Sequence, residues 1–262
     1  MVETSHGHTF VRISGPAEAP PLVLLPGSAS NSLMWATNIE ALSADFRTYA
    51  VDNIYDIGRS VYVRHLQSAD DFAIWLDELF TALGLGDRVN LMGASYGAWL
   101  ASRYALRFPN RLAKMVLVAP AATVLPVALE FWIRAILSMI HRRLAVSFMQ
   151  WIFADAARKD EASRRLMLEI MDEGRLAQRC YAPKKMIVPT TLTDEQLRRL
   201  KAPILYLVGE HEKVCSAKKA VRRLNKIAPQ IKIEVIPGAG HDLTVVQADL
   251  VNAKVIEFLK QP

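Results

Sequence analysis

Residues 89–106 read V-N-L-M-G-A-S-Y-G-A-W-L-A-S-R-Y-A-L, and the pattern G-x-S-x-G occupies residues 93–97 of this stretch. The apolar residues before the pattern are typical of a buried strand, and the residues after it favour a helix. A sharp turn between strand and helix forces the central serine into a strained backbone conformation, which only small neighbours tolerate. Ser95 is therefore a candidate nucleophile, with its hydroxyl held above the sheet edge. The alternative is a glycine-rich turn in which this serine only caps the helix.

Two later segments carry the residue types that a serine nucleophile needs. A hydroxyl is a poor nucleophile near neutral pH, so it requires a histidine base and an acid that orients the base. Residues 231–236 alternate like a half-buried strand and lead into P-G-A-G-H-D, which places His241 on a loop after that strand. Residues 203–209 predict a buried strand, and Glu210 and Glu212 follow it as the two candidate acids.

The order serine, acid, histidine is that of the α/β-hydrolase fold, and the chain resembles a serine hydrolase of this family over nearly its whole length. Residues 22–28, L-V-L-L-P-G-S, resemble the strand and oxyanion loop, with Pro26 where the family usually has histidine. Residues 52–60 resemble the family's D-x-x-G-x-G-x-S loop, but the first glycine is missing and one spacing is altered. The G-A-S-Y-G turn at residues 93–97 and the P-G-S loop together are most similar to those of bacterial carboxylesterases.

The resemblance implies roles for particular residues. The acid of the family lies three residues after Gly209, which is Glu212 here, although most relatives have aspartate at this position. Glu210 is the alternative acid; if it does not have this role, it is expected to be an exposed loop carboxylate. Backbone N–H groups of Ser28 and Tyr96 are expected to form the oxyanion hole, and Gly27 allows the loop to approach the substrate.

Strand patterns and helix patterns alternate along the chain, which predicts a mostly parallel sheet flanked by helices. Strands are expected near residues 8–13, 21–25, 46–51, 88–93, 113–118, 203–208 and 231–236, and helices near 32–43, 70–83, 96–107, 216–227 and 245–259. Residues 1–121 and 201–262 are expected to form this α/β-hydrolase core, with the active site at the carboxyl ends of the strands. Residues 122–200 contain no strand pattern and are expected to form a helical cap inserted in the core.

The expected cap has a wide apolar surface. A narrow polar stripe, made of Glu130, Arg134, Ser138 and Arg142, recurs at four-residue spacing, and apolar residues cover the rest of that helical segment. So wide an apolar face is expected to be buried, either by ordinary packing against the core and other helices or as the lining of an acyl pocket. The candidate lining residues are Trp132, Ile136, Phe148 and Ile152.

Composition narrows the class of protein further. The 262 residues are 52% hydrophobic and carry a formal net charge of +6, with acidic residues interspersed among basic pairs such as Arg142-Arg143 and Lys218-Lys219. No nucleic-acid-binding motif accompanies these pairs, and charges interrupt every apolar run before it could span a membrane. Cys180 and Cys215 suggest neither a disulfide nor a zinc site, and the first residues lack a secretory signal pattern, so a cytoplasmic location is expected. No metal and no cofactor are expected, and the oligomeric state is left open.

These observations predict a serine carboxylesterase that acts on small or medium apolar esters. Ser95 is expected to attack the carbonyl carbon, His241 to move the proton, and the acid to orient His241. Alternative reactions of the same fold are C–C bond hydrolysis, perhydrolysis, thioester hydrolysis, lactone hydrolysis and cyanohydrin cleavage. A catalytically silent ligand receptor is the alternative from a different class. Asp242, beside His241, is expected to cap the final helix.

Overall fold

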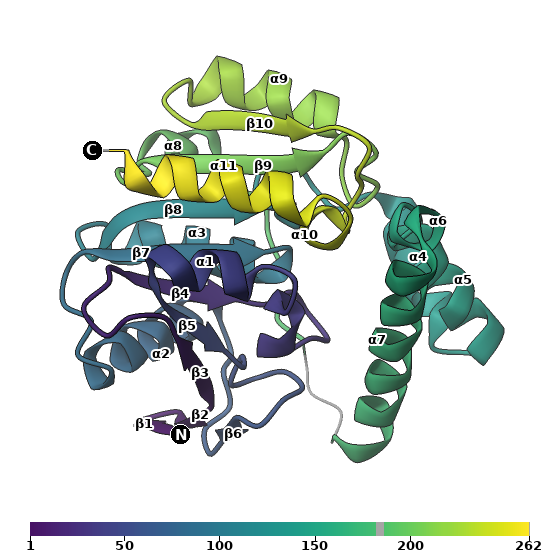
Figure 1. Cartoon of the computed structure of the whole chain (residues 1–262), viewed down its shortest axis with the longest axis horizontal. Helices are drawn as coiled ribbons and strands as arrows, with labels where there is room; N and C mark the ends of the chain where they lie inside the picture. The colour runs from purple at the N-terminus through teal and green to yellow at the C-terminus, as the bar shows by residue number, and fades with distance from the viewer. Residues whose placement is uncertain (182–185, 262) are drawn as a thin grey trace.

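Figure 1 shows the computed structural model of the chain, in which layers of helices cover the two faces of a central sheet; the structure describes residues 1–181 and 186–261. Within these residues, the sheet has seven strands in the order β10-β9-β8-β7-β4-β5-β3. Its strands are β3 (Val11–Ser14), β4 (Pro21–Leu25), β5 (Arg47–Val51), β7 (Val89–Ala94), β8 (Leu112–Val118), β9 (Ile204–Gly209) and β10 (Lys232–Ile236). Only the pair of β3 with β5 is antiparallel, so the sheet confirms the predicted fold class.

Strand β4 illustrates how the sequence builds two cores. Successive side chains of a strand point to opposite faces, and Leu22 and Leu24 belong to one buried cluster whereas Val23 and Leu25 belong to the other. The first cluster includes side chains of η1 (Ser32–Trp35), α1 (Ile39–Asp45) and α11 (Ala248–Lys260). The second includes side chains of α2 (Ala69–Ala82), α3 (Tyr96–Arg107), α8 (Asp194–Arg198) and α9 (Ala217–Ile227). The sheet is therefore buried on both faces.

Three predicted elements are interrupted in the structure. The strand expected over residues 8–13 divides into β2 (Gly7–Thr9) and β3, because the Phe10 N–H donates to Ser60 Oγ (2.8 Å) and not to a neighbouring strand. Strand β2 instead lies between β1 (Val2–Thr4) and β6 (Val61–Tyr62) in a small antiparallel sheet. The helix expected over 32–43 divides into η1 and α1, and the one expected over 245–259 into α10 (Leu243–Val246) and α11.

In the part of the chain that the structure describes, five helices lie between β8 and β9, and the last, α8, contributes Leu197 to the core of the sheet. The first four are α4 (Leu129–Ser138), α5 (Arg142–Ile152), α6 (Ala156–Lys159) and α7 (Glu161–Cys180). We call them the helical insertion. Figure 1 shows them together beyond the arrowheads of β8, β9 and β10, which is the carboxyl-terminal edge of the sheet. Residues 182–185, which belong to the expected cap, lie outside the described part of the chain.

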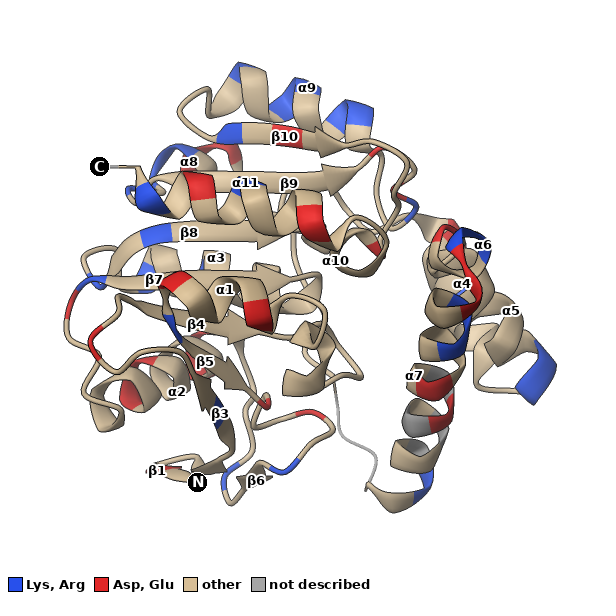
Figure 2. Cartoon of the chain, viewed as in Figure 1, with Lys and Arg blue, Asp and Glu red and all other residues tan. Residues whose placement is uncertain are grey.

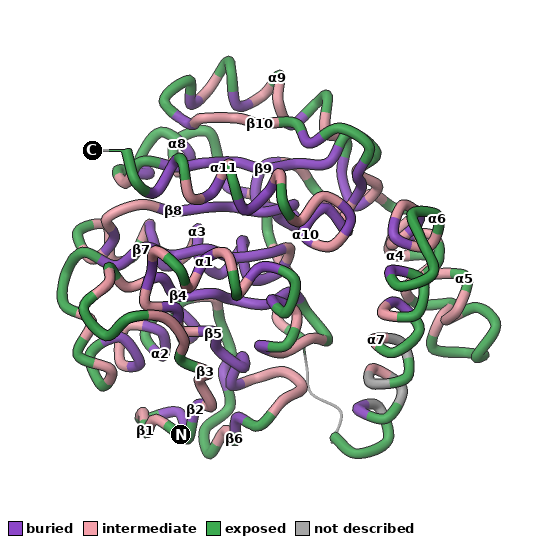
Figure 3. Tube along the Cα trace, in the orientation of Figure 1, coloured by how far each residue is buried: buried purple, intermediate pink, exposed green. Residues whose placement is uncertain are grey.

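The helical insertion is more exposed than the apolar pattern predicted. Figure 3 shows α4, α5 and α7 mostly as exposed and intermediate segments, and no residue of α4 is buried. The expectation that the whole apolar face is buried is wrong, because apolar residues surround most of α4 while its neighbours cover only part of it. The polar stripe is also not one helix face, since α4 ends at Ser138 and Arg142 begins α5.

Candidate active site

Ser95 lies in the sharp turn between β7 and α3, with φ of 51° and ψ of −112°. Its N–H donates to the carbonyl of Val118 on β8 (2.8 Å), which anchors the turn to the sheet. A Cβ at Gly93 would lie 2.3 Å from the Gly97 carbonyl oxygen, and a Cβ at Gly97 would lie 2.4 Å from the Leu25 carbonyl oxygen. Side chains are excluded at both positions, so the two glycines allow the backbone to hold Ser95 in this strained conformation.

Ser95, His241 and Glu212 form a continuous chain of hydrogen bonds. His241 Nε2 lies 3.0 Å from Ser95 Oγ, and His241 Nδ1 lies 2.9 and 3.1 Å from the two carboxylate oxygens of Glu212. With the proton of the neutral imidazole on Nδ1, the ring donates to Glu212 and leaves Nε2 to accept from the Ser95 hydroxyl. This arrangement can take a proton from the serine as it attacks an electrophile.

Burial sets the electrostatics of this chain. The Glu212 side chain is 1% exposed and the His241 side chain 9% exposed. Burial by itself lowers the pKa of His241, but the charge of Glu212, its hydrogen bond and the nearby Asp242 together raise the pKa of His241 above its ordinary value. Backbone N–H groups of Lys213 and Val214 donate to Glu212 Oε1 (2.8 and 2.7 Å), which fixes the carboxylate.

The Glu210 side chain lies on the same loop as Glu212 but does not contact His241. Its side chain is 57% exposed, and its Oε2 accepts from the Gly238 N–H (3.1 Å) and lies 3.9 Å from His211 Nε2. The structure therefore brings Glu212 to His241 and keeps Glu210 at the surface. The sequence left this choice to the family resemblance, because the two residues are only two positions apart.

The loop after β4 lies beside Ser95. A Cβ at Gly27 would lie 3.5 Å from Ser95 Cβ, so this glycine permits the close approach. Tyr96 is the first residue of α3, and a helix provides no acceptor for the N–H at that position. Gly27 therefore lies beside Ser95, and Tyr96 follows Ser95 at the start of α3; the oxyanion-hole role of the Ser28 and Tyr96 N–H groups stays a prediction.

Two aspartates that were not predicted as site residues support this loop. Asp52 Oδ1 accepts from the Ser32 N–H (2.8 Å), and Asp56 Oδ2 accepts from the Ala29 N–H (3.0 Å). Ala29 has a positive φ of 53°, which is a strained backbone conformation, and the contact with Asp56 helps to stabilise it. The D-x-x-G-x-G-x-S resemblance identified the segment that carries both aspartates, but nothing in the spacing indicated this contact.

A small apolar cluster adjoins the triad on the side of the helical insertion. Its buried members are Ala121, Ile152 and Val214, and partly buried side chains around them include Phe131 and Phe148. The cluster reaches the site because the Ala121 N–H donates to the Ser95 carbonyl (3.2 Å). The structure thus brings Ile152 and Phe148 close to the site.

The other two candidate lining residues belong to α4. Trp132 packs edge-on against Phe131, with ring centroids 5.5 Å apart. Ile136 is 62% exposed.

Asp242 connects the histidine loop to the helical insertion. Its carboxylate accepts from the N–H of Ala156 at the start of α6 (2.7 Å) and from the Gly240 N–H (3.3 Å). Among the described residues it makes no capping hydrogen bond to α10, so the prediction that it caps the final helix is wrong. Burial raises the pKa of Asp242 above its ordinary value. A second contact, His211 Nδ1 to Asp155 Oδ2 (3.2 Å), joins the loop after β9 to the residue that precedes α6.

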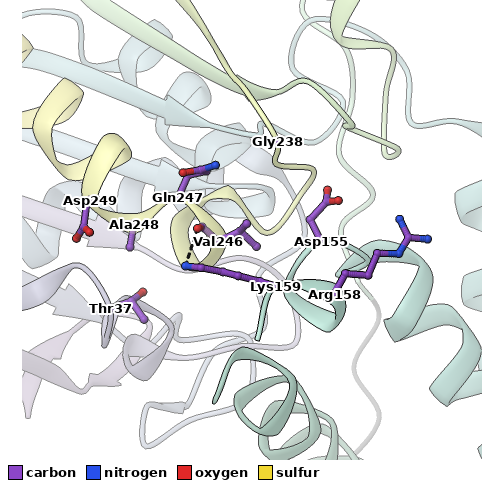
Figure 4. Close-up of a pocket in the computed structure, with 9 residues that line it drawn as sticks. All are labelled: Thr37, Asp155, Arg158, Lys159, Gly238, Val246, Gln247, Ala248 and Asp249. Carbon is purple, nitrogen blue, oxygen red and sulfur yellow. Dashed lines mark hydrogen bonds between the residues drawn. The ribbon is translucent and has the colours of Figure 1, made fainter. Parts of the chain in front are cut away.

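Figure 4 shows a pocket of about 580 Å³ beside these contacts, and Lys159 Nζ donates across it to the Val246 carbonyl (2.8 Å). Its lining residues are Thr37, Asp155, Arg158, Lys159, Gly238, Val246, Gln247, Ala248 and Asp249. None of the three hydrogen-bonded residues of the candidate site lines it. Among residues 1–181 and 186–261 no cluster of three or more His, Cys, Asp or Glu side chains is arranged to hold a metal ion. No helix in this part of the chain is long and apolar enough to cross a membrane.

Comparison with known proteins agrees with this geometry. A model of the alpha/beta hydrolase family matches residues 22–254. The chain belongs to the α/β-hydrolase family. Among members of this family, the carboxylesterase YbfK of Bacillus subtilis is 34% identical over 261 residues, which cover 98% of this chain and 86% of YbfK. The family resemblance inferred from the sequence is confirmed.

Solved structures of α/β hydrolases support the same assignment. The crystal structure of naproxen esterase from Bacillus subtilis superposes with a TM-score of 0.89 at 34% identity, over 99% of this chain and 90% of that one. A meta-cleavage product hydrolase from Pseudomonas fluorescens has a TM-score of 0.77 at 20% identity, over 98% of this chain and 97% of that one. The second likeness shows the fold alone.

Proposed function

We propose that the protein is a serine carboxylesterase that hydrolyses small to medium apolar esters through an acyl-enzyme intermediate. The observation that carries the proposal is the hydrogen-bonded chain of Ser95, His241 and Glu212 at the β7–α3 turn. Two Bacillus subtilis carboxylesterases, each 34% identical over 98% of this chain, support the ester substrate class. The same reaction needs no cofactor.

Each residue has a defined step in the proposed mechanism. His241 Nε2 takes the proton of Ser95 as Oγ attacks the ester carbonyl carbon, and the imidazolium then protonates the leaving alcohol. Glu212 keeps the imidazole in the required tautomer and stabilises its cation. Backbone N–H groups of Ser28 and Tyr96 stabilise the oxyanion. A water molecule, deprotonated by His241, attacks the acyl-enzyme and releases the acid with restoration of Ser95.

We propose further that residues 1–121 and 201–262 act as the catalytic core and residues 122–200 as a cap that binds the acyl group. The apolar cluster of Ala121, Ile152 and Val214, with Phe131 and Phe148 beside it, supports this proposal because it adjoins Ser95. Trp132 and Ile136 would extend the apolar surface outward along α4. The substrate is held by apolar contact alone in this cluster, which favours acyl chains without charge.

A cytoplasmic location is part of the proposal. Cys180 is exposed and unpaired and Cys215 is buried and unpaired. Burial raises the pKa of the Cys215 thiol to about 12, so this cysteine is a poor nucleophile. An exposed free thiol is compatible with a reducing compartment.

Labelling with a fluorophosphonate probe, followed by a panel of p-nitrophenyl esters, tests the function. Wild-type protein is expected to be labelled at one serine and to hydrolyse the short esters, whereas Ser95→Ala is expected to lose both properties with little change in folding. Ser102→Ala is a matched control, because Ser102 donates to the Trp99 carbonyl (2.7 Å) within α3 and is fully buried. Labelling without turnover of any ester in the panel would favour the C–C bond, perhydrolase, thioesterase or lactonase alternatives. Absence of labelling would favour a silent receptor.

A further inference from the structure

The turn between α4 and α5 carries an exposed apolar surface. Residues 136–144 read I-L-S-M-I-H-R-R-L, and we call them the α4–α5 turn. Met139 is 81% exposed, Ile140 70% and Ile136 62%. Figure 1 shows the free end of α5 at the outer edge of the helical insertion, on the side away from the sheet. These side chains therefore lie at the tip of the molecule and not between the insertion and the core.

Positive charge accompanies this apolar tip. Residues 131–154 contain Arg134, Arg142 and Arg143 but no Asp or Glu. Arg134 is paired with Glu130 (2.8 Å), whereas no ion pair of Arg142 or Arg143 is found among the residues whose side chains the structure describes. Figure 2 shows the basic end of α5 at the same outer edge. The tip thus offers large apolar side chains next to two exposed arginines.

We propose that the α4–α5 turn docks on the surface of a lipid bilayer that contains anionic lipids. Met139 and Ile140 would enter the boundary between headgroups and acyl chains, and Arg142 and Arg143 would contact lipid phosphates. A second copy of the chain fits the surface less well. A symmetric pairing through the turn would bring two copies of the Arg142-Arg143 pair together without a carboxylate between them.

The docking proposal does not depend on the proposed function, because binding to a bilayer requires no turnover. If the esterase function also holds, docking brings the enzyme to a phase in which apolar esters are concentrated. The Ser95→Ala protein is therefore expected to bind vesicles as the wild type does. The failure of one proposal is thus distinguishable from the failure of the other.

Sedimentation with phosphatidylcholine vesicles, with and without phosphatidylglycerol, tests the proposal on the full chain. The wild type is expected to bind the anionic vesicles on the order of tenfold more strongly than the neutral ones, and less so as salt is raised. Met139→Ser with Ile140→Ser, and separately Arg142→Gln with Arg143→Gln, are each expected to weaken binding on the order of tenfold. All variants should hydrolyse soluble p-nitrophenyl acetate at the wild-type rate and unfold at the wild-type temperature.

Lys218→Gln with Lys219→Gln is the matched control. It removes the same charge from the exposed face of α9, which Figure 2 shows on another side of the molecule, and α9 presents no large exposed apolar side chain beside these lysines. Binding should change less than about twofold in this variant, since the charge lies off the docking surface. Equal loss in the control and the arginine variant, no preference for anionic vesicles, or a dimer that Met139→Ser with Ile140→Ser dissociates would each overturn the proposal.

Discussion

Glu212 and Glu210 differ in what surrounds their carboxylates, although they leave the same strand. Glu212 is almost fully buried and contacts His241 Nδ1, while Glu210 is 57% exposed and contacts His211 and Gly238. A buried carboxylate that accepts from the imidazole fixes its tautomer, whereas an exposed one leaves the ring unaffected. The two residues therefore allow a direct comparison.

Glu212→Gln is expected to lower kcat by about 10⁴-fold, because a glutamine amide can donate to Nδ1 and leave the proton on Nε2, where it blocks transfer from Ser95. Glu210→Gln is the matched control and should keep kcat within about twofold, since surface substitutions of this kind have small effects. Steady-state hydrolysis of p-nitrophenyl acetate measures both variants. A larger loss in Glu210→Gln than in Glu212→Gln would assign the role of the acid to Glu210.

The pH dependence of activity follows from the raised pKa of His241. The imidazole must be neutral to accept the serine proton, so activity is expected to fall as the pH drops through the pKa of His241 in the folded protein. Because that pKa is raised, the acid limb of kcat/KM should lie above about 6.5, the value of an unperturbed histidine.

In Glu212→Gln the carboxylate charge is removed while burial remains, so the residual activity should show this limb at lower pH. Rates measured from about pH 5 to pH 9 in both proteins provide the comparison. A limb at the same pH in both would mean that Glu212 does not control the ionisation.

At the scale of elements, the turn that holds Ser95 depends on contact between α3 and β4. A Cβ at Gly97 would meet the carbonyl oxygens of Leu25 and Pro26 at 2.4 and 2.5 Å, and backbone atoms of a central strand cannot move aside. Gly174 on α7 has no atom within 4 Å of a Cβ added there. These two helical glycines have opposite surroundings.

Gly97→Ala is expected to destabilise the protein by about 3 kcal/mol and to abolish esterase activity, because α3 must move away from β4 and carry Ser95 and Tyr96 with it. Gly174→Ala should instead stabilise α7 by up to about 1 kcal/mol and leave activity unchanged, because alanine favours a helix. Thermal unfolding monitored by circular dichroism tests both. Wild-type stability and activity in Gly97→Ala would show that the close contact can relax.

At the scale of the whole molecule, the proposed binding of the acyl group depends on the contacts between the helical insertion and the core. The Asp242 to Ala156 contact and the His211 to Asp155 contact hold the start of α6 beside the loops that follow β10 and β9. The apolar cluster at Ala121, Ile152 and Val214 therefore keeps a defined distance from Ser95. An acyl group bound against this cluster, as proposed, would have a finite apolar surface to contact.

Activity on p-nitrophenyl esters is expected to rise with acyl length and then fall. Each added methylene that is buried contributes about 0.8 kcal/mol, or about fourfold in kcat/KM, until the acyl chain exceeds the pocket. Short to medium acyl chains should be preferred to long-chain triglyceride emulsions, even if the α4–α5 turn docks on bilayers, because docking does not enlarge the pocket. A series from acetate to palmitate measures the preference, and a maximum at the longest chains would identify a lipase.

Much of the core could be predicted from the sequence because its determinants are local. Alternation and apolar runs placed β4, β7, β8, β9 and β10 within about one residue of their observed limits, and α3 has the predicted bounds. The G-x-S-x-G pattern located the strained serine, since only glycines fit at positions 93 and 97 of so tight a turn. Single hydrogen bonds to distant residues, such as that from the Phe10 N–H to Ser60 Oγ, interrupted other elements without a local sequence signal.

Only the tertiary structure decided which side chains meet. Glu212 and not Glu210 faces His241, because residues 209–214 fold back so that two backbone N–H groups hold the Glu212 carboxylate. The carboxylate of Asp242 accepts from α6 and not from α10, a pairing of residues 86 positions apart that no periodicity encodes. The apolar surface of α4 could be predicted from the sequence, but its exposure could not, because burial depends on which neighbours the folded chain places against a helix.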